Sequence, residues 1–583
     1  MSENVIAKTS SVITSNLHPQ KTKHINSYED VVYAAGENYS LQLTARSLSH
    51  LDYVKNCKVH DFPSTGSPHL QHFTSFQTVF STRLNRNNEP KHHGQYCRVE
   101  NISNSSFTLI TTSSVSDAND VTSDIYMCGR AVGVGFQINN NASQQTTSSN
   151  SHTLLYSWSN DNLISTLQKV ENDFLNLPKT KDQRAFIVDS STGFEHSVIV
   201  LSNGMAMACG RNKNGQCGTG NFNDVPKWEI VPTNYHIVKT SCGSYHTAFL
   251  AGQDANSSNV NTLLYCGTFN NNGSNIFHCK LITLMECINN SSSSSEKKPT
   301  LGVEDEQFVD VKCGQNFTCV LTSSGNVYAF GRNAQGQCGT GVSTIKDVSK
   351  PTLMKGLDKV KISKIACGSS HTLLLTNTHF VYGVGNNESG QLGMGDVRTR
   401  YIPERNEFFA QMWIWDRKES SQKTLTSIKW PYEELPTYYD HVKDIACGPY
   451  HSAFVTICSD VYVCGLACFG QLGIGVFANG VVVPVKVNLH STTPSPYMQK
   501  IVQQKNLEYF PPSMIGMNYA TKEWRVCTSH NNSTFLVQTC VTGRIERFHK
   551  LLRKSLFYRG EELDYEESKM NFSDLIVISF EKN

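Results

Sequence analysis

The amino-acid sequence predicts an all-β fold, a seven-bladed β-propeller in which strands from the N- and C-termini share one blade. Three observations predict it. A two-part repeat recurs along the chain, its short apolar runs are bounded by Gly, Asn and Ser, and each chain end carries one unmatched half of the repeat. Joining the two halves removes the open sheet edges that a linear array would expose.

The repeat is clearest between residues 193 and 475. Its first half is an apolar run ending in Cys-Gly, followed by two residues, usually a His, and a second apolar run. Its second half is an apolar run ending in Gly, followed closely by Gln-x-Gly-x-Gly. The clearest copies occupy residues 193–220, 311–341, 364–395 and 444–475. The shortest interval, from Cys313 to Cys367, suits four strands per blade.

Weaker copies complete the ring. Residues 240–250 form a first half, residues 263–273 form a second half without the Gln, and residues 96–110 pair with 124–135. At the ends, residues 31–43 form a lone second half and residues 524–537 a lone first half. We therefore predict that these two end segments share the seventh blade. The longer intervals, from Cys367 to Cys447 and from Cys447 to Cys527, then contain insertions.

These residues resemble the regulator of chromosome condensation repeat, whose signature is Cys-Gly-x-x-His followed by Tyr-x-x-Gly-x-Asn-x-x-Gly-Gln-x-Gly-x-Gly. The second part matches best at Tyr328–Gly341 and Tyr382–Gly395. The resemblance covers residues 31–537 and implies the seven-bladed propeller of that family.

The repeated residues are interpreted as structural. One His per blade cannot converge on a single metal, so we expect each imidazole to fasten its own blade and each repeated Cys to be a small buried hydrophobic residue. The glycines allow positive φ and close approach, while Asn and Gln bond turn backbone. This set is Gly243, His246, Gly314, Gly331, Asn333, Gln337, Gly368, His371, Gly385, Asn387, Gln391, Gly448, His451, Gly465 and Gln471.

Chemistry-bearing motifs are weak. Cys464 and Cys468 are spaced as a ligand pair, but no second pair lies near them in the sequence. The glycine-rich segment 331–341 lacks the Gly-Lys-Ser/Thr of a phosphate loop and recurs from blade to blade. We predict no catalytic residues, no cofactor and no metal.

Composition limits which binding partners and which cellular compartment we expect. The formal net charge of +2 gives no strong nucleic-acid signal. The N-terminus lacks the apolar core of a secretory signal, and no stretch has the roughly 18 apolar residues that span a bilayer. The 19 cysteines are therefore expected to be free thiols in a reducing compartment, cytoplasmic or nuclear.

The expected organisation has three parts. Residues 1–26 form a disordered tail, residues 27–540 the propeller, and residues 541–583 a short helical extension. The propeller carries a low-complexity insert at 136–180 and an aromatic insert at 400–440. In the extension, a basic amphipathic helix precedes residues 571–583, which resemble the opening strand of a BTB/POZ domain.

The aromatic insert is the candidate partner-binding segment because it holds three of the six Trp, and aromatic residues with Arg favour binding hot spots. The alternative is that its rings cap the rim of the propeller. The candidate residues are Trp413, Trp415, Arg417, Trp430, Tyr432, Tyr438 and Tyr439.

We predict a non-enzymatic interaction scaffold whose partners are other proteins. The resemblance implies one alternative, guanine-nucleotide exchange on a small Ran-like GTPase, which is the activity of the family's founding member. A substrate adaptor for ubiquitin ligation is the other alternative, and it requires the BTB resemblance. The fold does not choose among them, nor does the sequence indicate the oligomeric state or the functional face of the propeller.

Overall fold

The structure is a computed structural model of the chain. It describes residues 28–36, 60–61, 71–81, 96–105, 107–115, 121–130, 163–169, 185–252, 260–268, 276–283, 306–414, 441–457, 460–487, 522–528 and 533–541, together with Cys287 and Gln503. Glu29–Cys540 is one compact unit. Met1–Tyr28 and Val541–Asn583 are grouped as a second unit, of which only Tyr28 and Val541 are described.

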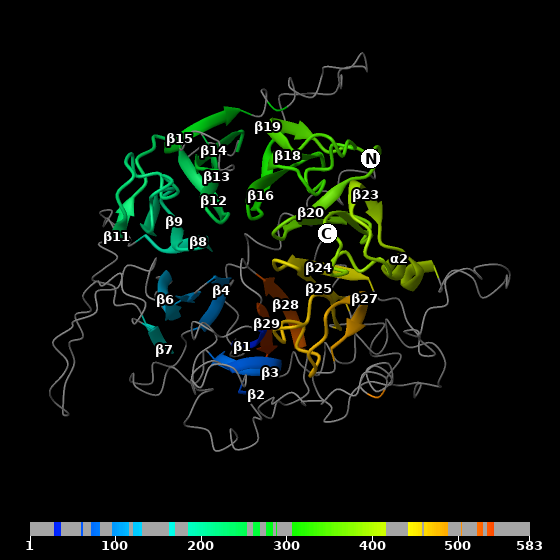
Figure 1. Cartoon of the computed structure of the whole chain (residues 1–583). Helices are drawn as coiled ribbons and strands as arrows, with labels where there is room; N and C mark the ends of the chain where they lie inside the picture. The colour runs from blue at the N-terminus through cyan, green and yellow to red at the C-terminus, as the bar shows by residue number, and fades with distance from the viewer. Residues whose placement is uncertain are drawn as a thin grey trace, which may run out of the picture. The chain divides into compact units, whose positions relative to one another are not determined.

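The strands form seven antiparallel sheets, the blades of a β-propeller (Figure 1). Blade 1 contains β4 (Tyr96–Asn104), β5 (Phe107–Val115), β6 (Val121–Arg130) and β7 (Leu163–Lys169). Blade 2 contains β8 (Ile187–Thr192), β9 (His196–Leu201), β10 (Ala206–Gly210) and β11 (Val225–Ile230). Blade 3 contains β12 (His236–Cys242), β13 (His246–Gly252), β14 (Thr262–Gly267) and β15 (Ile276–Thr283).

The next three blades repeat this four-strand order. Blade 4 contains β16 (Phe308–Cys313), β17 (Phe317–Thr322), β18 (Val327–Arg332) and β19 (Asp347–Leu353). Blade 5 contains β20 (Ile362–Cys367), β21 (His371–Thr376), β22 (Val381–Gly385) and β23 (Arg400–Arg405). Blade 6 contains β24 (Val442–Cys447), β25 (His451–Thr456), β26 (Val461–Gly465) and β27 (Val481–Lys486).

The seventh blade joins the two ends of the propeller, as predicted. Its strand order is β2 (His60–Asp61), β3 (Gln71–Ser81), β1 (Tyr28–Gly36), β29 (Ser533–Val541) and β28 (Lys522–Thr528). The C-terminal strands supply the inner side of this blade and the N-terminal strands the outer side. Blade 7 therefore confirms closure by strands that are far apart in the sequence.

The inner strands close a ring around a central axis. Each touches the inner strand of the next blade in the order β4, β8, β12, β16, β20, β24, β28 and back to β4. The second strand of blades 2 to 6 is buried along its whole length, because neighbouring blades cover both of its faces. Phe249, Phe317 and Phe454 fill these interfaces and are fully buried.

The structure describes part of each of the two predicted inserts. The expected low-complexity insert at 136–180 contains β7, the outer strand of blade 1, so part of it belongs to a blade. The aromatic insert begins with a short helix, α2 (Glu407–Ile414), directly after β23. Asn406 precedes α2, and its side-chain oxygen accepts the Phe409 N–H at 3.3 Å, which caps the helix.

Candidate functional site

The Cys-Gly-x-x-His turns join the first and second strands of their blades, and we call the end of the ring that they form the turn face. The turns are bonded to one another around the axis. Phe194 N–H donates to the Ser244 carbonyl at 3.3 Å, and Ser244 N–H donates to the Gln315 carbonyl at 3.0 Å. Ser369 N–H likewise donates to the Pro449 carbonyl at 3.3 Å. Backbone atoms therefore link successive blades at this face.

The repeated Gly is required by this crowding. A Cβ atom added to Gly243 would lie 2.0 Å from Cε1 of His246 and 2.7 Å from the carbonyl oxygen of Gly314 in the next blade. The same clash recurs at Gly368 with His371 and with the Gly448 carbonyl. Only Gly allows the imidazole and the neighbouring backbone to approach this closely.

The repeated imidazoles bond the next blade, which corrects the expectation that each fastens its own blade. His246 Nε2 lies 3.0 Å from Thr318 Oγ1, and His371 Nε2 lies 3.0 Å from Ser452 Oγ. His451 Nε2 lies 2.8 Å from Thr534 Oγ1, across the junction with the closing blade. The ring packs on the Gly of its own blade and makes its hydrogen bond to the next one. Sequence alone could not place neighbouring blades in this register.

The hydroxyl that meets the imidazole also fixes its tautomer. Thr534 Oγ1 donates to the Gln471 carbonyl at 2.7 Å, and Ser452 Oγ donates to the Gln391 carbonyl at 2.7 Å. A hydroxyl has one proton, so His371 and His451 must donate from Nε2. Burial lowers the pKa of both imidazoles to about 3, which keeps them neutral. Buried, neutral and bonded, they are structural links and not proton-transfer groups.

The repeated thiols bond in the opposite direction, to the preceding blade. Cys313 Sγ lies 3.1 Å from the Ser241 carbonyl oxygen, and Cys447 Sγ lies 3.5 Å from that of Ala366. Burial raises the pKa of Cys313 and Cys447 to about 12, so neither forms a reactive thiolate at neutral pH. Within the described part of the chain, no group of three or more His, Cys, Asp or Glu is arranged to hold a metal ion.

The closing blade corrects one equivalence. In blade 6 Cys447 pairs with Ser452, whereas in blade 7 it is Thr528 that pairs with Thr534. Thr528, not Cys527, therefore occupies the repeated Cys position. The turn of this blade carries Ser533, not His530, immediately before the hydroxyl residue.

The repeated Asn and Gln hold the loops between the third and fourth strands. Asn333 Nδ2 donates to Thr340 Oγ1 at 3.0 Å and to the Ile345 carbonyl at 2.8 Å, while its oxygen accepts the Cys338 N–H at 2.9 Å. Asn387 makes the equivalent bonds in blade 5. The Gln337 side-chain oxygen accepts the Gln335 N–H at 3.0 Å. These amides replace the ladder bonds that a tight loop leaves unpaired.

A ring of alternating charge, which our reading of the sequence missed, surrounds the axis. The residue three places before the Cys position is acidic in blades 2, 4 and 6 and basic in blades 3, 5 and 7. These residues are Asp189, Lys239, Asp310, Lys364, Asp444 and Arg525, and blade 1 has the neutral Asn101. Because seven is odd, one position has to break the alternation. Aligning the repeats at this position would have found the pattern, but the one-residue shift at Cys527 hides it.

Several members of this ring bridge neighbouring blades. Lys239 Nζ lies 3.3 Å from Asp310, and Lys364 pairs with Asp444. Asp189 accepts the Thr240 N–H of the next blade at 2.9 Å. Burial opposes ionisation of Asp310, but the nearby lysines outweigh it and lower the pKa of that carboxyl. The charges thus pair the edge strands that face the channel.

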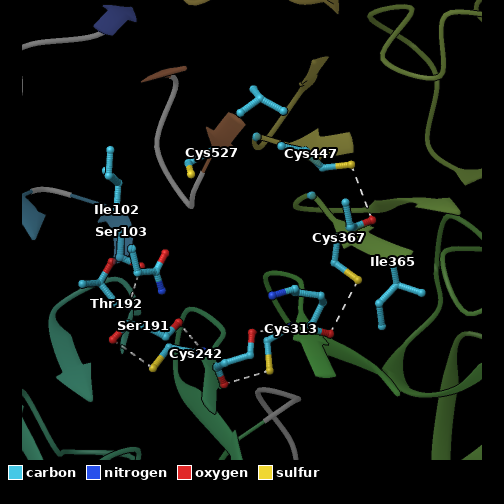
Figure 2. Close-up of a pocket in the computed structure, with 18 of the residues that line it drawn as sticks. Ile102, Ser103, Ser191, Thr192, Cys242, Cys313, Ile365, Cys367, Cys447 and Cys527 are labelled. Carbon is cyan, nitrogen blue, oxygen red and sulfur yellow. Dashed lines mark hydrogen bonds between the residues drawn. The ribbon is translucent and has the colours of Figure 1, made fainter. Parts of the chain in front are cut away.

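The inner strands enclose a central channel that contains a cavity of about 260 Å³. Figure 2 shows Ser103, Ser191 and Thr192 on one side of it, and Cys367 and Cys447 on the other. Lys312 and Asp189 also line the cavity. Its wall combines small polar side chains, thiols and apolar residues.

The candidate insert is only partly described. Phe408 and Phe409 of α2 pack on blade 6, with the Phe409 and Phe454 ring centroids 4.6 Å apart and the Phe408 and Tyr462 centroids 5.9 Å apart. Trp413 lies in α2, but its side chain is outside the described residues. The other candidate residues also lie outside them: Trp415, Arg417, Trp430, Tyr432, Tyr438 and Tyr439. The first turn of the insert is therefore anchored to the propeller.

Aromatic side chains project from the turn face. Phe194 in blade 2, Tyr245 in blade 3 and Tyr450 in blade 6 are 44, 37 and 43 % exposed. The Phe194 and Tyr245 rings are tilted neighbours, 6.0 Å apart. Each of these residues lies within the two variable positions before the His of its turn. The turns thus combine fixed structural residues with variable exposed ones.

The fold is a seven-bladed β-propeller, and the models of one repeat family match four of its blades. The models of the regulator of chromosome condensation (RCC1) repeat match residues 203–250 and 324–375 in one form and residues 187–216, 308–337 and 362–391 in a second. These matches lie in blades 2 to 5 and in the loops that join their strands. Within the described residues, no helix is long and apolar enough to cross a membrane.

Curated relatives share parts of the chain. The Ultraviolet-B receptor UVR8 of Arabidopsis thaliana is 27% identical over 289 residues, which is 49% of this chain and 54% of the relative. The probable E3 ubiquitin-protein ligase HERC4 of Homo sapiens is 29% identical over 49% of this chain and 22% of its own length. The X-linked retinitis pigmentosa GTPase regulator of Canis lupus familiaris is 32% identical over 31% of this chain and 15% of the relative. The chain thus matches about half or less of the length of these proteins.

Solved structures share the fold. Yeast RCC1 (Prp20), crystallised with Kap60, has a TM-score of 0.55 at 14% identity and covers 92% of this chain and 98% of its own. Human WBSCR16 has a TM-score of 0.52 at 15% identity and covers 88% and 99%. Identities this low establish the architecture alone.

Proposed function

We propose that this protein is a non-enzymatic interaction scaffold whose partners are other proteins. The proposal rests on the way the turn face combines buried structural residues with exposed aromatic ones. The repeated Gly, His and Cys residues are buried in contacts between blades, whereas Phe194, Tyr245 and Tyr450 are exposed. Aromatic side chains on a rigid frame supply large contact area with little loss of conformational entropy on binding.

The aromatic insert is the second part of the proposed binding surface. Its anchored start, Phe408 and Phe409 on blade 6, supports this assignment because a fixed root limits where the following residues can reach. The proposal assigns contact with partners to the residues after α2, among them Trp430 and Tyr432.

The test is affinity capture of partners with a variant in which residues 416–440 are replaced by a short Gly-Ser linker. This variant keeps Phe408 and Phe409, so the packing on blade 6 is retained. The matched control removes residues 291–295, a serine run in a different insert. We expect partners to be lost from the first variant and kept by the control. An unchanged set of partners would remove the insert from the binding surface.

A Phe194→Ser, Tyr245→Ser double variant tests the turn face separately. Both side chains are exposed, so we expect its unfolding temperature to stay close to that of the parent while partner capture falls. A matched Val188→Ser variant changes an exposed apolar residue that lies outside the turns. Equal capture by all three proteins would contradict a role for the turn face.

Guanine-nucleotide exchange is the alternative that the resemblance suggests. Release of labelled nucleotide from Ran-, Rab- and Rho-type GTPases, measured with the purified protein, separates the two functions. The scaffold proposal expects no acceleration, and a large acceleration on any one GTPase would replace it. The ubiquitin-adaptor alternative depends on residues 571–583, which lie outside the described residues.

A further inference from the structure

We propose that the central channel binds a small oxyanion, held by the ammonium of Lys312 and by the hydroxyl of Ser241 on the adjacent inner strand, while Ser191 and Ser103 continue the polar wall beside them. This site lies inside the channel beside the turns, because Gly368, Ser369 and Pro449 also line the cavity, but it uses none of the exposed aromatic side chains of the turn face. Its ligand class is a tetrahedral oxyanion such as inorganic phosphate or sulfate.

The four residues occupy one level of the ring. Each lies immediately before the Cys position of its inner strand, in blades 1, 2, 3 and 4 in succession. All four line the same cavity of about 260 Å³. Repeat geometry therefore places three hydroxyls and one ammonium side by side around a single arc of the channel wall.

Each of the three serine hydroxyls has an unused proton that it can donate. Ser103 Oγ accepts the Thr192 N–H at 3.1 Å, Ser191 Oγ accepts the Cys242 N–H at 2.9 Å, and Ser241 Oγ accepts the Cys313 N–H at 2.9 Å. A serine that accepts through oxygen still has its own proton to donate. Within the described residues, these three protons have no acceptor. Three successive blades thus present O–H donors at one level.

The ammonium of Lys312 makes no hydrogen bond within the described part of the chain. The nearest carboxylate to Lys312 Nζ is Asp310 at 3.8 Å, which is too long for a hydrogen bond, and Lys239 holds that carboxylate more closely. An ammonium that makes no hydrogen bond gains a charge-assisted one from a bound oxyanion.

The channel carboxylates stand at a different level of the strands, although the Asp310 carboxylate still lies 3.8 Å from Lys312 Nζ. Asp189, Asp310 and Asp444 are two residues farther down their strands, about 6.6 Å by strand geometry. Asp189 already accepts the Thr240 and Ser190 N–H groups and Asn101 Nδ2. Lys364 is paired with Asp444. At the level of the serines, Lys312 is therefore the one charged side chain on the cavity wall, within the described residues. The Asp310 carboxylate raises the pKa of Lys312 and keeps it cationic.

Titration of the full chain with inorganic phosphate, followed by isothermal calorimetry at constant ionic strength with chloride as the reference anion, tests the site. We expect saturable binding that chloride does not reproduce. In a Lys312→Ser variant the affinity should fall by at least about tenfold. This variant is conservative because blades 1 to 3 already carry Ser at the same position. Lys213→Ser is the control, since Lys213 is a cation with a 67 % exposed side chain on an outer loop.

A second measurement does not depend on a variant. Acetylation of Lys312 and Lys213 by a small anhydride is followed by mass spectrometry with and without phosphate. Protection of Lys312 alone supports the channel site. Equal rates for Lys312 in both conditions, or phosphate binding that survives Lys312→Ser unchanged, would overturn the proposal.

Discussion

Blades 4 and 6 each lack one of the two polar clamps, a His and an Asn, that blades 2 and 5 combine. Blade 4 has Phe317 where blades 2, 3, 5 and 6 have His, but its Asn333 loop is complete. Blade 6 has His451, but Ala467 stands at the position of Asn333. The clamp between blades and the clamp within a loop can therefore be lost separately without losing the propeller.

The missing clamps are replaced by different means. In blade 6, Ala467 N–H donates to the Ala478 carbonyl at 3.1 Å and Ala478 N–H donates back at 3.4 Å, while Leu472, Ile474 and Val476 bury apolar surface beneath the loop. In blade 4, the Phe317 ring contacts the same glycine that an imidazole would contact. Backbone pairing and apolar burial thus substitute for side-chain amides and imidazoles.

A missing imidazole also has consequences for the next blade. Phe107 takes the His position in blade 1, and Ser197 Oγ of blade 2 is buried without a partner. Blade 4 has Phe317 in place of the imidazole. The equivalent hydroxyl of blade 5, Thr372 Oγ1, still donates to the Gln337 carbonyl at 3.1 Å. The inter-blade hydroxyl therefore depends on two partners, and the Gln carbonyl alone is enough to hold it.

The largest expected effect is on acid stability, where the losses of two imidazoles add. The folded-state pKa of His371 and His451 is about 3, below the usual 6.5, so between these values the unfolded chain binds more protons. Their contribution to stability is present above pH 6.5 and is lost as the pH falls toward 3. At pH 5 the loss is about 2 kcal/mol for each imidazole.

His451→Phe gives blade 6 the residue of blade 4, and Phe317→His makes the reverse exchange. The fall in unfolding free energy from pH 7 to pH 5, measured by urea denaturation, should shrink by about 2 kcal/mol in the first variant and grow by a similar amount in the second. Identical pH profiles for both variants and the parent would contradict neutral buried imidazoles.

Asn333→Ala should destabilise the protein by about 3 kcal/mol, because it removes three hydrogen bonds, two of them buried, and leaves the Cys338 N–H and the Ile345 carbonyl without their side-chain partner. Urea denaturation at pH 7 measures the change. Blade 6 already has Ala at this position, but there two reciprocal Ala467–Ala478 backbone bonds close the loop, whereas blade 4 has one, from Asn333 N–H to the Lys346 carbonyl. A cost below about 0.5 kcal/mol would mean that the amide does not hold the loop.

Thr534→Val and Thr372→Val remove equivalent hydroxyls while keeping the side-chain shape. Thr534 serves both His451 and the Gln471 carbonyl, whereas Thr372 serves the Gln337 carbonyl and has only a weak 3.9 Å contact with the Cys319 thiol in place of an imidazole. We expect costs of about 2 and about 1 kcal/mol, respectively, from thermal unfolding. A larger cost at Thr372 would reverse the proposed order.

Ala467→Asn should have the smallest effect, within about 0.5 kcal/mol of the parent. Its backbone already pairs with Ala478, so a new amide finds the loop closed by other means. An increase of more than about 1 kcal/mol in the free energy of unfolding, measured by urea denaturation, would show instead that the loop of blade 6 lacks a stabilising amide.

The sequence predicted the ring because each half-repeat is a local pattern, and because the ends at 31–43 and 524–537 lacked partners. The sequence could not predict the contacts between blades. The His451 to Thr534 bond, the alternating charges and the level shared by Lys312 and the serines all depend on the register of one inner strand against the next. A one-residue shift at Cys527 was enough to misalign the closing blade.

The most direct test of a ring held together from blade to blade is hydrogen exchange on a chain that ends at Val487 and so lacks β28 and β29. Blade 4 lies across the ring from the deletion and keeps its own four strands. If closure and inter-blade bonds stabilise the ring as one unit, the amides of β17 will lose protection together with those of blade 6. Full protection of β17 in the shortened chain would contradict this account and describe a row of independent blades.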